Sequence, residues 1–370
     1  MRIFVLFVVV AVANAAYLVP LLKNSEPIKN SYILKVKDSV DLDDVAPKLA
    51  KLRIEVQWKY VTLKGFAVRA QETDLHALRT MSEFEYIEED GVVRANIEWG
   101  CDRIDQRDLP LDDIMNLYHD GSGAHVYIID TGLRHSHVEF EPNRASFHFD
   151  YETRGDVPPG DDCNGHGTHC GGSAAGVTVG IGTSARLYSV RVLNCMGAGS
   201  WANCIAGCDS VTATGTRPGV SSLSLGGGAH QGMDDAVTRM IQAGFVVSIA
   251  AGNDNHDACL NSPARVEEAI TVGATDDTDT RASFSNYGPC VDIFAPGVSV
   301  RSSYHLSDTS YATLSGTSMA CPHVTGVSAV HLGANTCFNN TDCKAKILAE
   351  ASVDKVIDHQ SPDNLLLYCD

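Results

Sequence analysis

The sequence predicts an α/β domain with a mainly parallel central sheet covered by helices on both faces, preceded by a small α+β module. Beyond residue 100, short apolar runs alternate with helical stretches and glycine-rich turns, which is typical of a parallel sheet buried on both faces. The runs are 125–129, 186–193, 220–225, 245–251, 269–272 and 291–294. Residues 31–95 instead follow the order strand, helix, strand, strand, helix, strand.

The smaller module is predicted from local patterns. Its strands alternate apolar and polar residues, and its helices have acidic or capping residues in their first turns. Strands are predicted at 31–37, in two pieces within 57–70 that meet near 63–65, and at 86–87 and 92–93 around a turn at 89–91. Helices are predicted at 41–52 and from 73 to 78. This order describes a ferredoxin-like α+β module.

Charge and cysteine content place a boundary near residue 95. The 370 residues contain 46 acidic and 28 basic side chains, a formal net charge of −18. Residues 1–94 hold 13 of each sign, so residues 95–370 carry the whole excess with 33 acidic against 15 basic side chains. All 12 cysteines lie beyond residue 100. So acidic a domain is not expected to bind nucleic acid, which requires Lys and Arg at phosphates.

The N-terminus has the features of a secretory signal peptide over residues 1–15. Met1-Arg2 is followed by an apolar run to Val12 and by Ala13-Asn14-Ala15, with small residues two apart at a cleavage site. The alternative is a membrane anchor, but about 11 apolar residues are too few to span a bilayer. We therefore expect a secreted protein with no membrane partner, whose cysteines are mostly paired.

Polar residues follow several of the apolar runs or begin the helices after them. Active sites of parallel α/β sheets lie at the carboxyl ends of the strands, so these residues are expected to lie close together. They are Asp130 in Asp130-Thr-Gly, His166 in Asn164-Gly-His-Gly-Thr-His-Cys170, Asn253 in Ala250-Ala-Gly-Asn253, and Ser318 in Ser315-Gly-Thr-Ser318-Met-Ala. Taken singly, such segments are more often turns, structural histidines or helix caps.

Together the four residues provide what acyl transfer requires. A serine hydroxyl becomes a nucleophile when an imidazole removes its proton, and a buried carboxylate fixes the tautomer of that imidazole. We predict that Ser318 attacks, His166 acts as base and then acid, and Asp130 orients His166. Asn253 and the Ser318 backbone N–H are predicted to bind the oxyanion. The chain order Asp, His, Ser is that of subtilisin and disfavours an esterase of the α/β-hydrolase kind.

These segments resemble the subtilisin-like serine proteases of the peptidase S8 family, most closely the proteinase K branch. The resemblance covers residues 31–370 and implies a three-layer subtilisin-like fold for residues 96–370. It also implies that residues 16–95 are an inhibitory propeptide, which the enzyme itself cuts away between about Val93 and Asn96.

The resemblance extends to a substrate cleft. Two segments are similar to the walls of the pocket for the side chain before the scissile bond, and a third to the edge that pairs with substrate backbone. The wall residues are Ser224, Leu225, Gly226, Ala250, Ala251 and Gly252, and the edge residues are Gly197, Ala198 and Gly199. Small residues suit strand addition, in which main-chain hydrogen bonds provide affinity. Broad cleavage with a mild preference for apolar or aromatic residues is expected, although ordinary glycine-rich turns are the alternative.

Resemblance to secreted animal relatives implies two disulfides, Cys163–Cys195 and Cys259–Cys290. Cys337 and Cys343 bracket a short loop and are candidates for a third pair. The partners of the remaining cysteines stay open; these are Cys101, Cys204, Cys208, Cys321 and Cys369. Cys170, one helical turn after His166, is either an inert buried residue or a thiol whose modification displaces the histidine.

The resemblance implies a structural calcium ion but no cofactor for catalysis. Asp292 matches a calcium ligand of the proteinase K branch, with the backbone carbonyls of Glu267 and Ala269 as companions, and oxygen ligands suit this ion. Asn339-Asn340-Thr341 is an N-glycosylation sequon, and its use stays open.

The sequence therefore predicts a secreted, monomeric serine endopeptidase, made as an autoprocessed zymogen, that acts on proteins or peptides. An endosomal, lysosomal or vacuolar lumen is the other location open to it. The alternative function is a self-cleaving but otherwise inactive binding protein that retains its propeptide. Such binders tend to lose the oxyanion asparagine or to gain a C-terminal interaction domain. Asn253 is present and the chain given stops at Asp370, so we expect the protease.

Overall fold

The computed structural model describes residues 18–24, 27–91, 97–141, 143–151 and 157–370. The chain divides into two compact units, Met1–Arg94 and Ala95–Asp370, at the place where the charge and cysteine content change. The expected signal peptide and the expected cleavage site between Val93 and Asn96 lie outside the described residues.

The N-terminal unit is a five-stranded sheet with its helices packed on one core. Its sheet order is β1-β5-β2-β4-β3, in which β2, β3, β4 and β5 pair antiparallel and β1 pairs parallel with β5. The elements are β1 (Leu21–Leu22), β2 (Pro27–Val36), α1 (Leu42–Lys51), β3 (Glu55–Tyr60), β4 (Gly65–Arg69), η1 (Glu72–Asp74), α2 (Leu75–Arg79) and β5 (Phe84–Gly91). Leaving aside the short β1, this is the predicted ferredoxin-like order.

The predicted turn at 89–91 is wrong. Glu88 and Glu89 pair with Ile33 and Tyr32 of β2, so β5 continues to Gly91 as one strand. Glu89 also accepts a hydrogen bond from Lys23 at 2.6 Å, which offsets the charge of an acidic strand. Tertiary pairing has therefore overridden the local turn preference of Glu-Asp-Gly.

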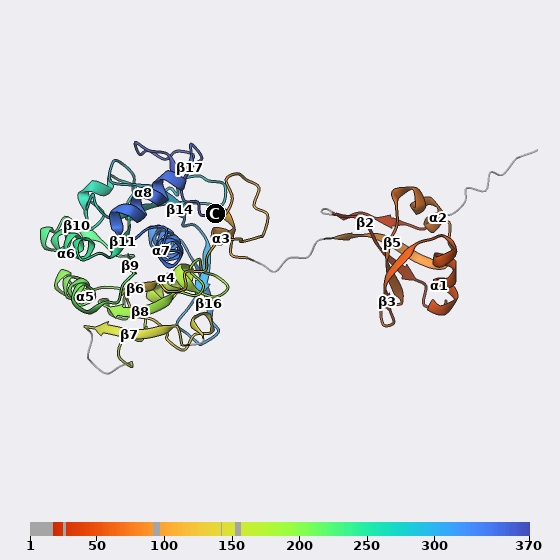
Figure 1. Cartoon of the computed structure of the whole chain (residues 1–370), viewed down its shortest axis with the longest axis horizontal. Helices are drawn as coiled ribbons and strands as arrows, with labels where there is room; N and C mark the ends of the chain where they lie inside the picture. The colour runs from red at the N-terminus through yellow and green to blue at the C-terminus, as the bar shows by residue number, and fades with distance from the viewer. Residues whose placement is uncertain (1–17, 25–26, 92–96, 142, 152–156) are drawn as a thin grey trace, which may run out of the picture. The chain divides into compact units, whose positions relative to one another are not determined.

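The larger unit contains the predicted α/β domain (Figure 1). Its helices are α3 (Trp99–Ile104), η2 (Val138–Phe140), α4 (His166–Ala175), α5 (Trp201–Thr214), α6 (Gln231–Gln242), η3 (Ala258–Leu260), α7 (Thr317–Gly333) and α8 (Asn340–Glu350). Its longer strands are β6 (His125–Asp130), β7 (Ala145–Asp150), β8 (Arg186–Arg191), β9 (Gly219–Leu223), β11 (Val246–Ala250) and β13 (Ile270–Thr275). The shorter strands are β10 (Gly227–Gly228), β12 (Asn261–Ser262), β14 (Ile293–Pro296), β15 (Val300–Ser303), β16 (Tyr311–Leu314), β17 (Ser352–Val353) and β18 (Leu365–Leu366).

The described residues form a nine-stranded sheet in this unit, in the order β17-β18-β14-β13-β11-β9-β6-β8-β7. Every pairing in it is parallel except the one between β17 and β18 at the edge. All six apolar runs identified in the sequence contribute a strand. The edge strand β7 was not predicted, because its residues are half-buried and lack a continuous apolar run.

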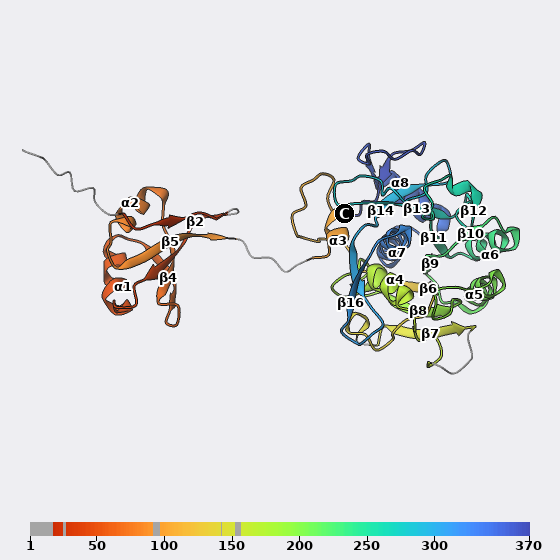
Figure 2. The same ribbon diagram turned by 180° about the vertical axis from the view of Figure 1, so that it is seen from behind.

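Helices cover both faces of this sheet, as expected for parallel strands. Figures 1 and 2 show α4 and α7 on one side of β6, β9 and β11, with α5 and α6 on the other. Two separate clusters of buried apolar side chains lie on the two faces. Helix α7 is buried along nearly its whole length, consistent with a helix that runs through the core.

This topology brings the candidate site residues to one edge of the sheet. β6 lies between β8 and β9, and β9 lies next to β11. Because these strands are parallel, the segments after Asp130, Leu223 and Ala250 leave the sheet at the same edge. Among the described residues, no helix is long and apolar enough to cross a membrane.

Candidate active site

Asp130 and His166 form the centre of the site. Asp130 is the last residue of β6 and is fully buried, while His166 is the first residue of α4 and is partly exposed. His166 Nδ1 lies 2.8 Å from Oδ1 and 2.9 Å from Oδ2 of Asp130. A carboxylate in this position accepts the Nδ1 proton, which leaves Nε2 as the basic nitrogen.

The pKa of His166 is raised well above the ordinary histidine value. Burial lowers the pKa, but the charges of Asp130 and then Cys170, together with the hydrogen bonds of both side chains to the ring, raise it. The sequence predicted the pair from the order of its motifs, and the structure brings the two side chains into contact. The adjacent buried anion therefore makes the neutral ring a stronger base.

Asp162, which the sequence analysis did not single out, holds the two segments of this pair together. Its carboxylate accepts hydrogen bonds from Thr131 Oγ1 at 2.9 Å and from the N–H and Oγ1 of Thr168 at 2.9 and 2.6 Å. It also accepts from the backbone N–H groups of Asn164 and Gly165. Thr131 follows Asp130 directly, so one carboxylate positions the end of β6 and the start of α4.

Gly165 is required by the turn before His166. Its φ of 108° lies in the region that favours glycine, and a Cβ there would collide with the ring of Tyr304. The Tyr304 hydroxyl donates to the Asn164 carbonyl oxygen at 3.2 Å. The approach of the chain to His166 is thereby fixed from two sides.

Ser318 lies in the first turn of α7, and Cys170 lies between it and this pair, with its Sγ 3.4 Å from the Ser318 carbonyl oxygen and 4.0 Å from His166 Nδ1. Ser318 Oγ donates to the Ser224 carbonyl oxygen at 3.2 Å, and Ser224 Oγ donates to the Ser318 carbonyl oxygen at 3.0 Å. Within the described residues, Ser318 Oγ makes no hydrogen bond to His166. Before His166 can take this proton, the hydroxyl must exchange its bond to Ser224 for one to the ring, and such bonds often tighten only when substrate is bound.

Asn253 is held so that its amide nitrogen is available. Its Oδ1 accepts hydrogen bonds from the Thr317 backbone N–H at 2.8 Å and from Thr317 Oγ1 at 3.0 Å. With the oxygen fixed in this way, the Nδ2 group remains as a donor near Ser318. Thr317, a residue that the sequence analysis quoted only as part of a motif, therefore orients the predicted oxyanion group.

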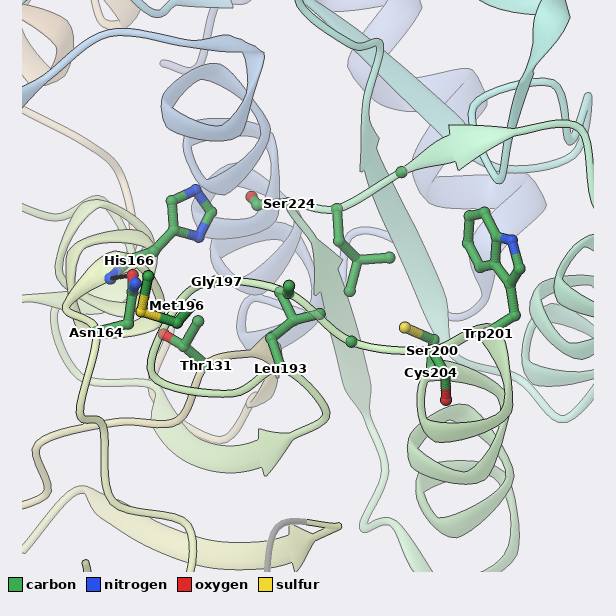
Figure 3. Close-up of a pocket in the computed structure, with 14 residues that line it drawn as sticks. Thr131, Asn164, His166, Leu193, Met196, Gly197, Ser200, Trp201, Cys204 and Ser224 are labelled. Carbon is green, nitrogen blue, oxygen red and sulfur yellow. Dashed lines mark hydrogen bonds between the residues drawn. The ribbon is translucent and has the colours of Figure 1, made fainter. Parts of the chain in front are cut away.

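Two adjoining cavities contain the predicted substrate-binding residues. The larger has a volume of about 720 Å³ and extends from His166 past Gly197 and Leu193 to Trp201 and Cys204 (Figure 3). The smaller, of about 250 Å³, is lined by Asn253, Ser318 and the predicted wall residues Ser224, Leu225, Gly226, Ala250, Ala251 and Gly252. The sequence analysis missed Trp201, whose ring stacks on His230 with centroids 5.3 Å apart.

The edge at Gly197, Ala198 and Gly199 is only partly free. Asn194 engages both backbone groups of Ala198, since Asn194 N–H donates to its carbonyl at 2.8 Å and Asn194 Oδ1 accepts from its N–H at 3.2 Å. Gly199 makes no backbone hydrogen bond within the part of the chain that the structure describes. Gly199 is therefore the position on this edge that is open to pair with an extended peptide.

The structure contains three disulfides, Cys163–Cys195, Cys259–Cys290 and Cys337–Cys343. The expectation that the cysteines are mostly paired is wrong, because six remain as buried thiols. The central sheet separates several of them, since Cys204 and Cys208 pack on one face, and Cys170 and Cys321 on the other. Burial raises the pKa of Cys170, which favours the inert alternative for this residue.

The oxygens expected around calcium bind a lysine side chain instead. The structure does bring Asp292 and the carbonyl oxygens of Glu267 and Ala269 together, but the ammonium group of Lys344 lies among them. A divalent cation does not fit beside a bound ammonium group. The sequence analysis missed this because Lys344 lies 52 residues beyond Asp292 in the chain.

Comparison with known proteins decides the family. The profile of the subtilase family, peptidase S8, matches residues 121–365, which is more than half of the chain. The chain belongs to the subtilase family. This subtilase is 48% identical over 313 residues to an extracellular serine proteinase of Thermus sp. (strain Rt41A), covering 83% of this chain and 75% of that protein. It is 42% identical over 318 residues to alkaline serine exoprotease A of Vibrio alginolyticus, covering 83% of this chain and 59% of that protein.

A solved structure confirms the predicted subtilisin-like fold. The crystal structure of a cold adapted subtilisin-like serine proteinase matches this subtilase with a TM-score of 0.71 and 43% sequence identity. The match covers 75% of this chain and 99% of that chain. Membership of the subtilase family assigns this protein to the serine peptidases.

Proposed function

We propose that this subtilase is a secreted serine endopeptidase of broad specificity that acts through Asp130, His166 and Ser318. The contact that carries the proposal is the one between His166 Nδ1 and both oxygens of the buried Asp130 carboxylate. It leaves Nε2 of the ring available to remove a proton, and we assign Ser318 as the hydroxyl that gives up this proton. The proposed chemistry uses protein groups only.

In the proposed reaction Ser318 Oγ attacks the scissile carbonyl while His166 Nε2 takes the hydroxyl proton. The tetrahedral oxyanion accepts hydrogen bonds from Asn253 Nδ2 and from the Ser318 backbone N–H, which lies in the first turn of α7. His166 then gives its proton to the leaving amine, and an acyl-enzyme forms on Ser318. Water activated by His166 hydrolyses this ester and restores the serine.

Substrate recognition is proposed to rest mainly on peptide backbone. An extended peptide can add to the Gly199 edge, with its side chains in the two cavities beside it. Leu193, Trp201 and Leu225 give the larger cavity apolar walls, which favours apolar or aromatic side chains there. Among the described residues, only His166 and Asp254 bring an ionisable side chain to either cavity, so strong selection for charged residues is not expected.

The N-terminal unit is proposed to be an inhibitory propeptide that the enzyme removes. It has its own apolar core and a composition without cysteine. The alignment with the Thermus proteinase covers 83% of 370 residues, about 307, which exceeds the 276 residues of Ala95–Asp370 and so reaches into this unit. The solved relative matches only 75% of the chain, close to the length of the larger unit.

Secretion is proposed from the composition of the N-terminus, the three disulfides and the name of the extracellular Thermus relative. The sequon at Asn339 fits a secretory route, because this side chain is exposed at the N-terminus of α8. Export through an oxidising compartment allows the disulfides to form.

Expression of the full chain and of Ser318→Ala tests the proposal. The wild-type protein is expected to lose the N-terminal unit and to hydrolyse casein, and Ser318→Ala to do neither. Ser307→Ala, which removes an exposed loop hydroxyl, is the matched control and should behave as wild type. Processing or casein hydrolysis by Ser318→Ala at the wild-type level would contradict the proposal.

A further inference from the structure

The ammonium group of Lys344 is fully engaged by three oxygen atoms at one end of the sheet. Lys344 Nζ lies 2.7 Å from the carbonyl oxygens of Glu267 and Ala269 and 2.7 Å from Asp292 Oδ1. A lysine ammonium group has three donors and no acceptor. Each donor has its own oxygen here, so the cluster is complete without another group.

The same three oxygens are those that the sequence analysis expected around calcium. Calcium binds oxygen ligands at about 2.3–2.6 Å, which would place the ion where Nζ lies. Two cations cannot occupy one position, and the Lys344 and Asp292 side chains are only 18% and 21% exposed. The ligand set therefore fits a cation, and the chain provides that cation itself.

Helix α8 carries a second anchor for the same loop. Asn340, one turn before Lys344, donates from Nδ2 to the Glu268 carbonyl oxygen at 2.6 Å, and its Oδ1 accepts from Val247 N–H at 3.0 Å. The carbonyls of residues 267, 268 and 269 thus all accept from α8. The Cys337–Cys343 disulfide ties the start of this helix to the preceding loop.

Asp292 links the cluster to the wall of the smaller cavity. Its Oδ2 accepts from Thr271 N–H at 2.8 Å, while Oδ1 binds Lys344. Thr271 Oγ1 donates to the carbonyl oxygen of Ala264, a residue that lines this cavity. A cation at this place therefore holds a loop that leads into β13 and supports the cavity wall.

We propose that Lys344 replaces a divalent metal ion at this position, so that the loop 267–269, which leads into β13, is held without calcium. In this protein the ammonium group performs the structural task of the ion. The same oxygens should bind calcium once the ammonium group is removed and space is left for the ion. The proposal does not depend on the catalytic roles assigned above, because its readouts are stability and metal binding.

The test compares the thermal midpoints of wild type, Lys344→Ala, Lys344→Met and Asp292→Asn in calcium and in chelator. A sulfonyl fluoride is present throughout to prevent autolysis. Both lysine variants should unfold several degrees below wild type in chelator. Calcium should restore most of this loss in Lys344→Ala, where there is room for the ion, and little in Lys344→Met, where the side chain fills the space.

Calcium bound elsewhere in the protein could also raise the thermal midpoint. Asp292→Asn and the double variant Lys344→Ala/Asp292→Asn distinguish that effect from binding at the Lys344 position. Wild type and Asp292→Asn should gain equally from calcium, and the extra gain of Lys344→Ala should vanish in the double variant. Calorimetric titration with calcium should show one more site in Lys344→Ala than in wild type.

Three results would overturn the proposal. The first is a calcium gain in wild type that Asp292→Asn abolishes, since the metal would then use Asp292 while Lys344 is present. The second is wild-type stability of both lysine variants in chelator. The third is a destabilised Lys344→Ala that gains neither stability nor a site with calcium, which would reduce the cluster to an ordinary ion pair.

Discussion

His166 Nδ1 lies within 2.9 Å of both carboxylate oxygens of Asp130, and the Asp130 carboxylate is almost completely buried. Water therefore cannot compete effectively for this anion, which also accepts a hydrogen bond from Thr131 N–H at 2.7 Å. The contact fixes the ring orientation and favours the protonated imidazole.

The rate of peptide hydrolysis should rise with pH through the pKa of His166. The protonated ring cannot accept the serine proton, and the pKa of His166 is raised well above 6.5, with the Asp130 charge as the largest raising cause. In a profile of kcat/KM against pH, we expect the ascending limb to lie above 6.5. Asp130→Asn should move the limb to lower pH and reduce kcat by about 10⁴. An ascending limb below 6.5 in wild type would contradict this.

Loss of the Asn253 amide donor should lower kcat with little effect on KM, because an oxyanion donor acts only in the transition state. Asn253→Leu and the isosteric Asn253→Asp are both expected to lose about 10²–10³-fold in kcat. Thr317→Val, which removes one of the two bonds that orient Asn253, should lose less. Steady-state kinetics on a peptide substrate measures this. A raised KM at unchanged kcat would instead assign Asn253 to ground-state binding.

Glu98 should make the larger unit less stable as the pH rises. Burial raises the pKa of this carboxyl from 4.5 to about 7, although it accepts hydrogen bonds from Gly100 and Arg301 N–H. The folded state therefore holds the proton more tightly than the unfolded chain. Its stabilising contribution is complete below about pH 4.5 and is lost as the pH rises through 7, roughly 3 kcal/mol in all.

Denaturant unfolding of wild type and Glu98→Gln between pH 4.5 and 8 checks this value. The free energy of unfolding of Glu98→Gln relative to wild type should increase over this range, whatever its starting level. Glu141→Gln, at an exposed carboxyl, is the control and should show no such trend. A constant difference between Glu98→Gln and wild type would show that the carboxyl does not titrate there.

The six unpaired thiols should not react with thiol reagents in the folded protein. Each is at most 4% exposed, and burial raises their pKa values, to about 11 for Cys204 and Cys321. A thiol reagent such as Ellman's should react with almost none of them in buffer and with six per molecule in denaturant. Reaction of Cys170 in the folded protein, with loss of activity, would revive the alternative that this thiol can displace His166.

The parts of the fold that the sequence predicted are those set by local composition. Continuous apolar runs identified β6, β8, β9, β11, β13 and β14, because strands buried on both faces need apolar residues throughout. The edge strand β7 and the last residues of β5, 89–91, depend on pairing with distant strands. Nothing in the sequence of those segments alone shows that pairing.

The site residues were predictable for a different reason. Asp130, His166, Asn253 and Ser318 each end or follow a strand or lie at the start of a helix, and their order restricts the chemistry. Asp162 and Thr317 act through other side chains, and their roles depend on hydrogen bonds that only the folded chain forms. Lys344 is the clearest case, since its partners come from two distant segments.

Covalent labelling tests whether Ser318 is a nucleophile that His166 activates. A fluorophosphonate probe is added to the processed wild-type enzyme and to His166→Ala, and the labelled peptide is identified by mass spectrometry. We predict one adduct per molecule, on Ser318, in wild type and almost none in His166→Ala. An adduct on another residue, or equal labelling of Ser318 in His166→Ala, would contradict the account.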